Sequence, residues 1–328
     1  MTVAKTESLR VILGTGGTIA GRSGDPGDNV GYVAGEVGVG DLLAAVPPLR
    51  GLKLESEQVA QLDSKDMDFP VWRRLAERLT HHLAREEVQG IVVTHGTDTI
   101  EETAWFLQTV LQPRKPVVLT CAMRPATALV PDGPQNLLDA VAVSGCKGLS
   151  GVVVVCAGLV HSARDVAKVH SYRVDAFESG DAGPLGCVEE GVVRWFHPLP
   201  AELPCVSGRN LLLDRVLQTR TLPRVSLITS HADSDGTVVR GLVALAERYR
   251  ELKTDGIVVA CTGNGTLHTA LQAALQEAQD CGIRVVRATR CARGRVIPSK
   301  QALFSDSDGL SPVKARLALS LSILADQA

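Results

Sequence analysis

The stretch RVILGTGGTIAG, residues 10–21, joins a short apolar run directly to a glycine-rich turn. A continuous apolar run of this length indicates a strand that helices cover on both faces, as in parallel α/β sheets. Similar runs recur along the first half of the chain, and helical patterns lie between them. This alternation predicts an α/β fold with a largely parallel sheet. The expected strands are 10–14, 88–96, 116–122 and 151–158, and the expected helices are 69–83, 99–111 and 134–145.

A second α/β segment follows a proline-containing stretch. Residues 197–210, HPLPAELPCVSGRN, have no clear period, which indicates the end of a domain or a linker. We therefore expect a two-domain α/β protein, with a parallel-rich sheet in a larger N-terminal catalytic domain over residues 1–200, a linker over 201–222 and a smaller α/β domain over 223–328. In the smaller domain we expect strands at 224–230, 255–263 and 283–289 and helices at 267–280 and 312–325.

The composition excludes several classes of protein. A formal net charge of -2 and an aromatic content of 3% argue against a nucleic-acid-binding surface. No apolar run is long enough to span a bilayer, and the first ten residues lack the apolar segment of a signal peptide. The eight cysteines form no C-x-x-C pair, which favours reduced thiols in the core. These features predict a cytoplasmic protein with no nucleic-acid or membrane partner.

The glycine-rich turn could hold a phosphate or present a hydroxyl. The dinucleotide-binding pattern fails because Ile19 stands at its third glycine, and the P-loop pattern has Arg22 in place of lysine. No periodic helix follows, so the turn lacks the N–H groups and dipole of a helix N-terminus. We favour a mobile loop that presents the hydroxyl of Thr15, with Tyr32 available to relay a proton. The alternative is that Thr15 only forms the turn and Tyr32 only packs on apolar surface.

A second polar cluster lies in VVTHGTDTIEETAWFL, residues 92–107, where a predicted strand ends and a helix begins. In one interpretation, Thr97, Asp98 or Thr99 caps the helix. In the other, Thr97 and Asp98 face a ligand, because ligands of open α/β sheets bind outside the carboxyl ends of the strands. Ser64, in QLDSKDMD, lies on a third loop and could bind a carboxylate.

The motifs LGTGGTIAG, SKDM, THGTDTIEETAWFL, AMRP and ARDVAK, followed by GNG and SPVKARLAL, resemble those of the bacterial L-asparaginases, a family that also contains glutaminase-asparaginases. Each motif alone is modest, but their order over essentially the whole chain is highly specific. The resemblance implies a two-domain α/β amidohydrolase that converts L-asparagine to L-aspartate and ammonia, with side activity on L-glutamine. It also implies a homotetramer built as a dimer of intimate dimers, a threonine nucleophile, and no metal or cofactor.

The resemblance further implies a reaction. We predict that Thr15 attacks the side-chain amide carbon to give an acyl-enzyme and ammonia, and that water then releases aspartate. Backbone N–H groups near Gly96 and Thr97 are candidate oxyanion donors. Whether Thr15 or Thr97 is acylated stays open. The implied site residues are Thr15 as nucleophile with Tyr32 as its partner, Thr97, Asp98 and Lys168 as the second catalytic group, Ser64 and Asp98 on the α-carboxylate and α-amino group of the substrate, and Asn264 lent by the neighbouring subunit.

Two positions depart from the family pattern. Lys65 stands where family members often have Gln or Glu, and lysine cannot accept a hydrogen bond from the substrate ammonium. It could instead pair with a carboxylate or point away. The family also supplies a glutamate from the C-terminal domain, but the corresponding stretch PSKQALFSDSDGLSP has none, and Asp306 or Asp308 is a candidate replacement. The preference for asparagine over glutamine therefore stays open.

Two other functions compete with amide hydrolysis. A sensor that kept the fold would bind an amino acid without releasing ammonia. A subunit that feeds ammonia to a tRNA-dependent partner would carry an added docking domain or a basic excess, and this chain has neither.

Overall fold

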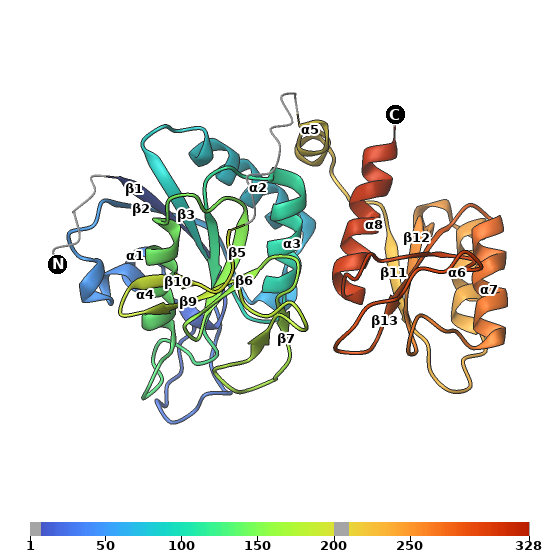
Figure 1. Cartoon of the computed structure of the whole chain (residues 1–328), viewed down its shortest axis with the longest axis horizontal. Helices are drawn as coiled ribbons and strands as arrows, with labels where there is room; N and C mark the ends of the chain where they lie inside the picture. Colours follow the sequence, from blue (N-terminus) through green and yellow to red (C-terminus); the bar gives the residue numbers. More distant parts are fainter. Residues whose placement is uncertain (1–7, 200–209, 328) are drawn as a thin grey trace. The chain divides into compact units, whose positions relative to one another are not determined.

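The computed structural model describes residues 8–199 and 210–327, which belong to two compact units, residues 1–210 and 211–328. Each unit contains its own sheet with helices packed on it, so the predicted two-domain α/β class with a parallel-rich larger domain is confirmed (Figure 1). No helix within the described ranges is both long and apolar enough to cross a lipid bilayer.

The larger unit is built on one sheet, which has eight strands within the described residues, in the order β10-β9-β6-β5-β4-β3-β1-β2. The five strands from β2 to β5 run parallel, as the continuous apolar runs predict. The three strands beyond β5 pair antiparallel, which those runs did not predict. The strands are β1 (Leu9–Gly16), β2 (Leu54–Leu62), β3 (Val88–Thr94), β4 (Val117–Thr120), β5 (Val152–Cys156), β6 (Leu159–Ser162), β9 (Gly186–Glu189) and β10 (Val192–Trp195).

Helices cover both faces of this sheet (Figure 1). On one face, α1 (Val39–Ala44) and α4 (Gly133–Ser144) pack over a hydrophobic core. Ile12 of β1 and Val92 of β3, which lie opposite each other, are fully buried in this core. On the other face lie α2 (Phe69–Leu83) and α3 (Ile100–Leu111), which are joined by the stacked rings of Trp72 and Phe106, 5.1 Å apart. Burial on both faces explains why the central strands consist mainly of apolar residues.

Edge strand β2 and the short strand pair β7–β8 were not predicted. β2 reads LESEQVAQL and is an edge strand of the described sheet with β1 as its neighbour, so most of its residues are at least partly exposed and it keeps charged residues and lacks an apolar run. The pair β7 (Ala167–Lys168) and β8 (Phe177–Glu178) forms a separate two-stranded sheet beyond β6. The glycine-rich turn continues into a short 3-10 helix, Thr18–Ala20, and a bridge then joins Arg22 to Val33.

The smaller unit has a parallel sheet in the order β11-β12-β13-β14, whose core includes Ile257, Val259 and Leu275. Of the expected linker 201–222, residues 201–209 lie outside the described residues, and helix α5 occupies part of the rest. The elements of this unit are α5 (Leu211–Gln218), β11 (Val225–Thr229), α6 (Thr237–Arg248), β12 (Gly256–Cys261), α7 (Thr269–Asp280), β13 (Arg284–Thr289), β14 (Ser305–Asp306) and α8 (Pro312–Asp326).

Candidate active site

Two glycines bring the polar loops that follow β1 and β3 into contact. β1 and β3 are parallel neighbours, so both loops leave the sheet at the carboxyl ends of the strands. Gly17 has φ +79°, and a Cβ there would lie 2.3 Å from both the Cα and the N of Gly96. No side chain fits in this space, so only glycine permits the contact. The residues that follow these glycines, Thr18 and Thr97, are therefore held at the same edge of the sheet.

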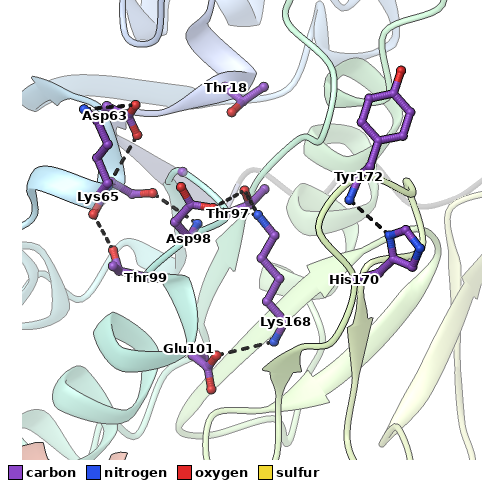
Figure 2. Close-up of polar contacts among 12 residues, drawn as sticks. Thr18, Asp63, Lys65, Thr97, Asp98, Thr99, Glu101, Lys168, His170 and Tyr172 are labelled. Atoms are coloured by element: carbon purple, nitrogen blue, oxygen red, sulfur yellow. Dashed lines mark hydrogen bonds and ion pairs between the residues drawn. The ribbon is translucent and has the colours of Figure 1, made fainter. Parts of the chain in front are cut away.

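The structure brings Thr97, Asp98 and Lys168 together, as the sequence predicts. The Lys168 ammonium donates to Thr97 Oγ1 at 2.8 Å and to Asp98 Oδ1 at 2.6 Å (Figure 2). The Lys168 side chain is 17% exposed and that of Asp98 is 52% exposed, whereas Thr97 is buried. The ion pair therefore lies between the buried Thr97 hydroxyl and solvent. This geometry lets a cation and a carboxylate orient one threonine hydroxyl.

Thr18, and not Thr15, is the partner of Tyr32. The Tyr32 hydroxyl lies 2.6 Å from Thr18 Oγ1, and the Tyr32 ring packs against Gly21. Thr15 is still part of β1, is 1% exposed and donates its hydroxyl to the carbonyl of Thr94 at 2.9 Å. The expectation that Thr15 and Tyr32 form a pair is therefore wrong, because the strand extends through Thr15 and only the residues after the glycines leave it. Thr18, the second threonine of GTGGT, is therefore a candidate site residue that the sequence analysis did not single out.

Tyr32 keeps its proton at neutral pH. Burial is the main cause that raises the pKa of Tyr32 above its usual value of 10.0. The hydrogen bond with Thr18 opposes this rise, while the carboxylates of Asp63 and Asp98 add to it. A protonated phenol at 2.6 Å can pass its proton on as it receives one from the Thr18 hydroxyl.

Ser64 is hydrogen-bonded to the turn that carries Thr97 and Asp98. Its Oγ accepts from the backbone N of Asp98 at 3.2 Å, and its carbonyl accepts from Thr99 Oγ1 at 2.8 Å. Gly96 is again required, because a Cβ there would lie 2.4 Å from Ser64 Oγ. The predicted substrate-binding pair of Ser64 and Asp98 is thus adjacent in space.

Lys65 points at the carboxylates of its own loop. Its ammonium lies 2.6 Å from Asp66 Oδ2 and 3.4 Å from Asp63 Oδ2, and its side chain is 61% exposed. The bond to Asp66, followed by the bond to Asp63, raises the pKa of Lys65. Its charge is therefore already balanced within the loop.

Asn264 belongs to the smaller unit, where its Oδ1 accepts from the backbone N of Ile297 at 2.7 Å. Its predicted contribution to a site in a neighbouring subunit stays a prediction. Asp306, a candidate for the missing glutamate, accepts from the backbone N of Asp308 at 2.9 Å within a local turn.

His95, which the sequence analysis did not single out, lies behind the Gly96–Thr97 turn in a buried chain of hydrogen bonds. Its Nδ1 lies 2.7 Å from the Gly96 carbonyl, its Nε2 lies 2.9 Å from Thr103 Oγ1, and Trp72 Nε1 donates to the same Oγ1 at 2.8 Å. Burial lowers the pKa of His95 to about 4, against a smaller opposing effect of the Gly96 carbonyl. Because a carbonyl only accepts, the neutral ring carries its proton on Nδ1, and Nε2 accepts from Thr103.

The buried His95 predicts a specific dependence of stability on pH. The folded-state pKa of about 4 lies below the unfolded value of 6.5. The unfolded chain therefore binds the proton first as pH falls, and stability present above pH 6.5 is lost on the way to pH 4. Urea unfolding at several pH values in this window should give a slope for wild type that exceeds that of His95→Asn by up to about 1.4 kcal/mol per pH unit. The exposed His81 provides the control: His81→Asn should keep the wild-type slope. Equal slopes for wild type and His95→Asn would contradict a neutral buried imidazole.

Within the described residues, no group of three or more His, Cys, Asp or Glu side chains is arranged to hold a metal ion.

Comparison with known proteins gives two family matches that together span nearly the whole chain. Residues 11–201 match the family described as "Asparaginase, N-terminal", and residues 224–327 match "Glutaminase/Asparaginase C-terminal domain".

Relatives and a solved structure agree with these matches. The chain is 37% identical over 319 residues to "L-asparaginase 2" of Bacillus subtilis, covering 95% of this chain and 81% of that protein. It is 34% identical over 326 residues to "Glutaminase-asparaginase" of Pseudomonas fluorescens, covering 97% and 86%. The crystal structure of "Probable Cytoplasmic L-asparaginase" from Campylobacter jejuni is similar at a TM-score of 0.86, with 38% identity over 96% of this chain and 95% of that one. This chain is therefore a member of the asparaginase family and contains both of its domains.

Proposed function

We propose that this protein hydrolyses the side-chain amide of L-asparagine to give L-aspartate and ammonia, with L-glutamine as a second substrate. Family membership and the names of the relatives support the reaction class. The observation that carries the proposal is the group Thr97–Asp98–Lys168, bonded at 2.8 Å and 2.6 Å, at the sheet edge that also holds Thr18 and Tyr32. A site built only to bind an amino acid has no need for two activated threonines.

In the first half of the reaction, Thr18 is the nucleophile. Threonine is weak at its free pKa, so its proton must leave as Oγ1 attacks the side-chain amide carbon. The Tyr32 hydroxyl, 2.6 Å away, takes part in that transfer by receiving one proton and giving up its own. The C–N bond then breaks, the nitrogen gains a proton and leaves as ammonia, and the substrate acyl group stays on Thr18 as an ester. Thr15 has no such role, because its hydroxyl is buried against the Thr94 carbonyl.

In the second half of the reaction, water attacks the ester carbon and displaces the oxygen of Thr18. Lys168 donates to Thr97 Oγ1 and is itself held by Asp98, so the Thr97 hydroxyl is oriented to relay protons to the leaving nitrogen and from the attacking water. The amides of Gly96 and Thr97 are the candidate oxyanion donors. Hydrolysis of the ester returns the Thr18 hydroxyl and releases aspartate, so the enzyme ends each cycle unchanged.

Substrate binding is assigned to residues on the same loops. Ser64 binds the α-carboxylate and Asp98 binds the α-ammonium group, consistent with their adjacency. Asn264 is proposed to act on the site of a neighbouring subunit in a homotetramer, a dimer of intimate dimers, which light scattering tests. A cytoplasmic location is proposed as well, and the similar Campylobacter jejuni structure, named a probable cytoplasmic L-asparaginase, supports it.

The test is a coupled assay of ammonia release from L-asparagine and L-glutamine by the purified full chain. Release from L-asparagine supports the proposal, and the ratio of the two rates gives the preferred amide. Binding of either amino acid without ammonia release would identify a sensor and contradict the proposal. Strictly monomeric active enzyme would contradict the shared site.

A further inference from the structure

The first turn of α3 contacts both halves of the site through two side chains that the reaction itself does not use. We propose that this turn sets the position of substrate-binding Ser64 relative to Lys168, with Thr99 and Glu101 as its two positioning residues. The inference rests on the proposed function for its kinetic consequences, but the contacts that carry it can be tested separately.

Thr99 holds the loop of Ser64. It occupies the N-cap position of α3, yet its side chain makes no capping hydrogen bond. Threonine is favoured at that position because its oxygen accepts from the first turn of the helix. Here Oγ1 donates instead to the carbonyl of Ser64 at 2.8 Å, across 35 residues of sequence. Together with the hydrogen bond from the Asp98 backbone N to Ser64 Oγ, it ties the side-chain oxygen and the carbonyl of Ser64 to the start of α3.

Glu101 holds the strand that carries Lys168. Its Oε1 accepts from the backbone N of Lys168 at 3.4 Å, across 67 residues of sequence (Figure 2). Among the residues that the structure describes, this strand, β7, pairs with β8 and not with the main sheet, so its position depends on such contacts. One helical turn beyond Glu101, the Trp105 ring lies under the guanidinium of Arg164 at 6.0 Å. The segment from Arg164 to Lys168 is therefore attached to α3 at two points spaced by one turn.

The two contacts lead to different kinetic consequences. Ser64 binds substrate in the ground state and in the transition state, so displacing it weakens both and raises KM. Lys168 orients the proton-relaying Thr97, so displacing it slows the chemical steps and alters their pH dependence. A loss of general rigidity would instead affect both parameters together.

The experiment compares four variants of the full chain with wild type in the ammonia assay. Thr99→Val keeps the shape but removes the donor, and we expect KM to rise about tenfold with kcat within about twofold of wild type. Thr99→Ser restores the donor and should behave as wild type. Glu101→Ala should lower kcat about tenfold and shift the pH profile of kcat, whereas Glu101→Gln, which keeps an acceptor oxygen and loses the charge, should retain wild-type values.

Hydrogen exchange of the backbone amides gives a readout that does not depend on activity. Thr99→Val should speed exchange in residues 64–67, and Glu101→Ala should speed exchange at residues 167–169.

If wild type releases no ammonia, the proposed function fails, while the exchange pattern still tests the positioning contacts. Unchanged exchange in both variants overturns the inference. In an active enzyme, it is also overturned if Thr99→Ser matches Thr99→Val, if Glu101→Gln matches Glu101→Ala, or if Glu101→Ala lowers kcat equally at every pH. If Thr99→Val fails to fold by circular dichroism, Thr99→Ala replaces it with the same expectation.

Discussion

Replacement of Thr18 by alanine is expected to lower the rate of ammonia release from L-asparagine at least about a thousandfold, because the attacking oxygen is removed. The fold should survive, since the change removes one hydroxyl and one methyl group next to a half-buried tyrosine and leaves the Gly17–Gly96 contact intact. The measurement is kcat/KM for the variant and wild type, with circular dichroism to establish that both are folded.

Thr15 provides the matched control within the same motif. Thr15→Val keeps the volume but removes the buried bond to the Thr94 carbonyl, so it should cost about 1 kcal/mol of stability and leave the rate within about tenfold of wild type. Thr15 and Thr18 lie on one peptide between Arg10 and Arg22, so tandem mass spectrometry that locates the modified residue is needed, and in enzyme quenched during turnover it should find the acyl adduct on Thr18. If Thr15→Val is inactive while Thr18→Ala retains most of the rate, the nucleophile is Thr15 and the assignment made here is wrong.

Replacement of Lys168 by methionine should have the second-largest effect, a loss of about a hundredfold to ten-thousandfold in kcat. Methionine is unbranched and can occupy most of the space of the lysine stem, but it donates no hydrogen bond to Thr97 Oγ1 and leaves the Asp98 carboxylate without its 2.6 Å partner. Thr97 then loses its orientation, and the proton relay of both half-reactions slows. Steady-state kinetics over a range of pH would measure this loss.

Lys147 serves as the control for loss of a lysine, because it is exposed in the turn after α4. Lys147→Met should change kcat by less than about twofold, as is usual for surface substitutions. A folded Lys168→Met enzyme with a kcat within tenfold of wild type would show that the ammonium takes no part in the chemical steps. The proposed role of Thr97 would then need another source of orientation.

Much of the fold followed from short-range patterns. β3, β4 and β5 are central strands buried on both faces, so their apolar runs are unambiguous. The helical pattern of residues 69–83 matches the bounds of α2, where Asp68 caps the first turn through Val71 N. β2 was missed because an edge strand buries little of its surface. The antiparallel strands beyond β5 were missed because they are short and because their pairing depends on partners distant in sequence.

The sequence by itself determined the family and the two-domain α/β class, because runs of apolar residues and ordered motifs are local properties. Through the family resemblance it also predicted a group of Thr97, Asp98 and Lys168, and the structure brings these three side chains within hydrogen-bonding distance. Only the tertiary structure decided which threonine of GTGGT faces Tyr32. That choice depends on where β1 ends and on the contact between Gly17 and Gly96, two residues far apart in the chain. Whether a hydroxyl is buried in a sheet or presented at its edge is a property of packing, and a motif read one residue at a time does not contain it.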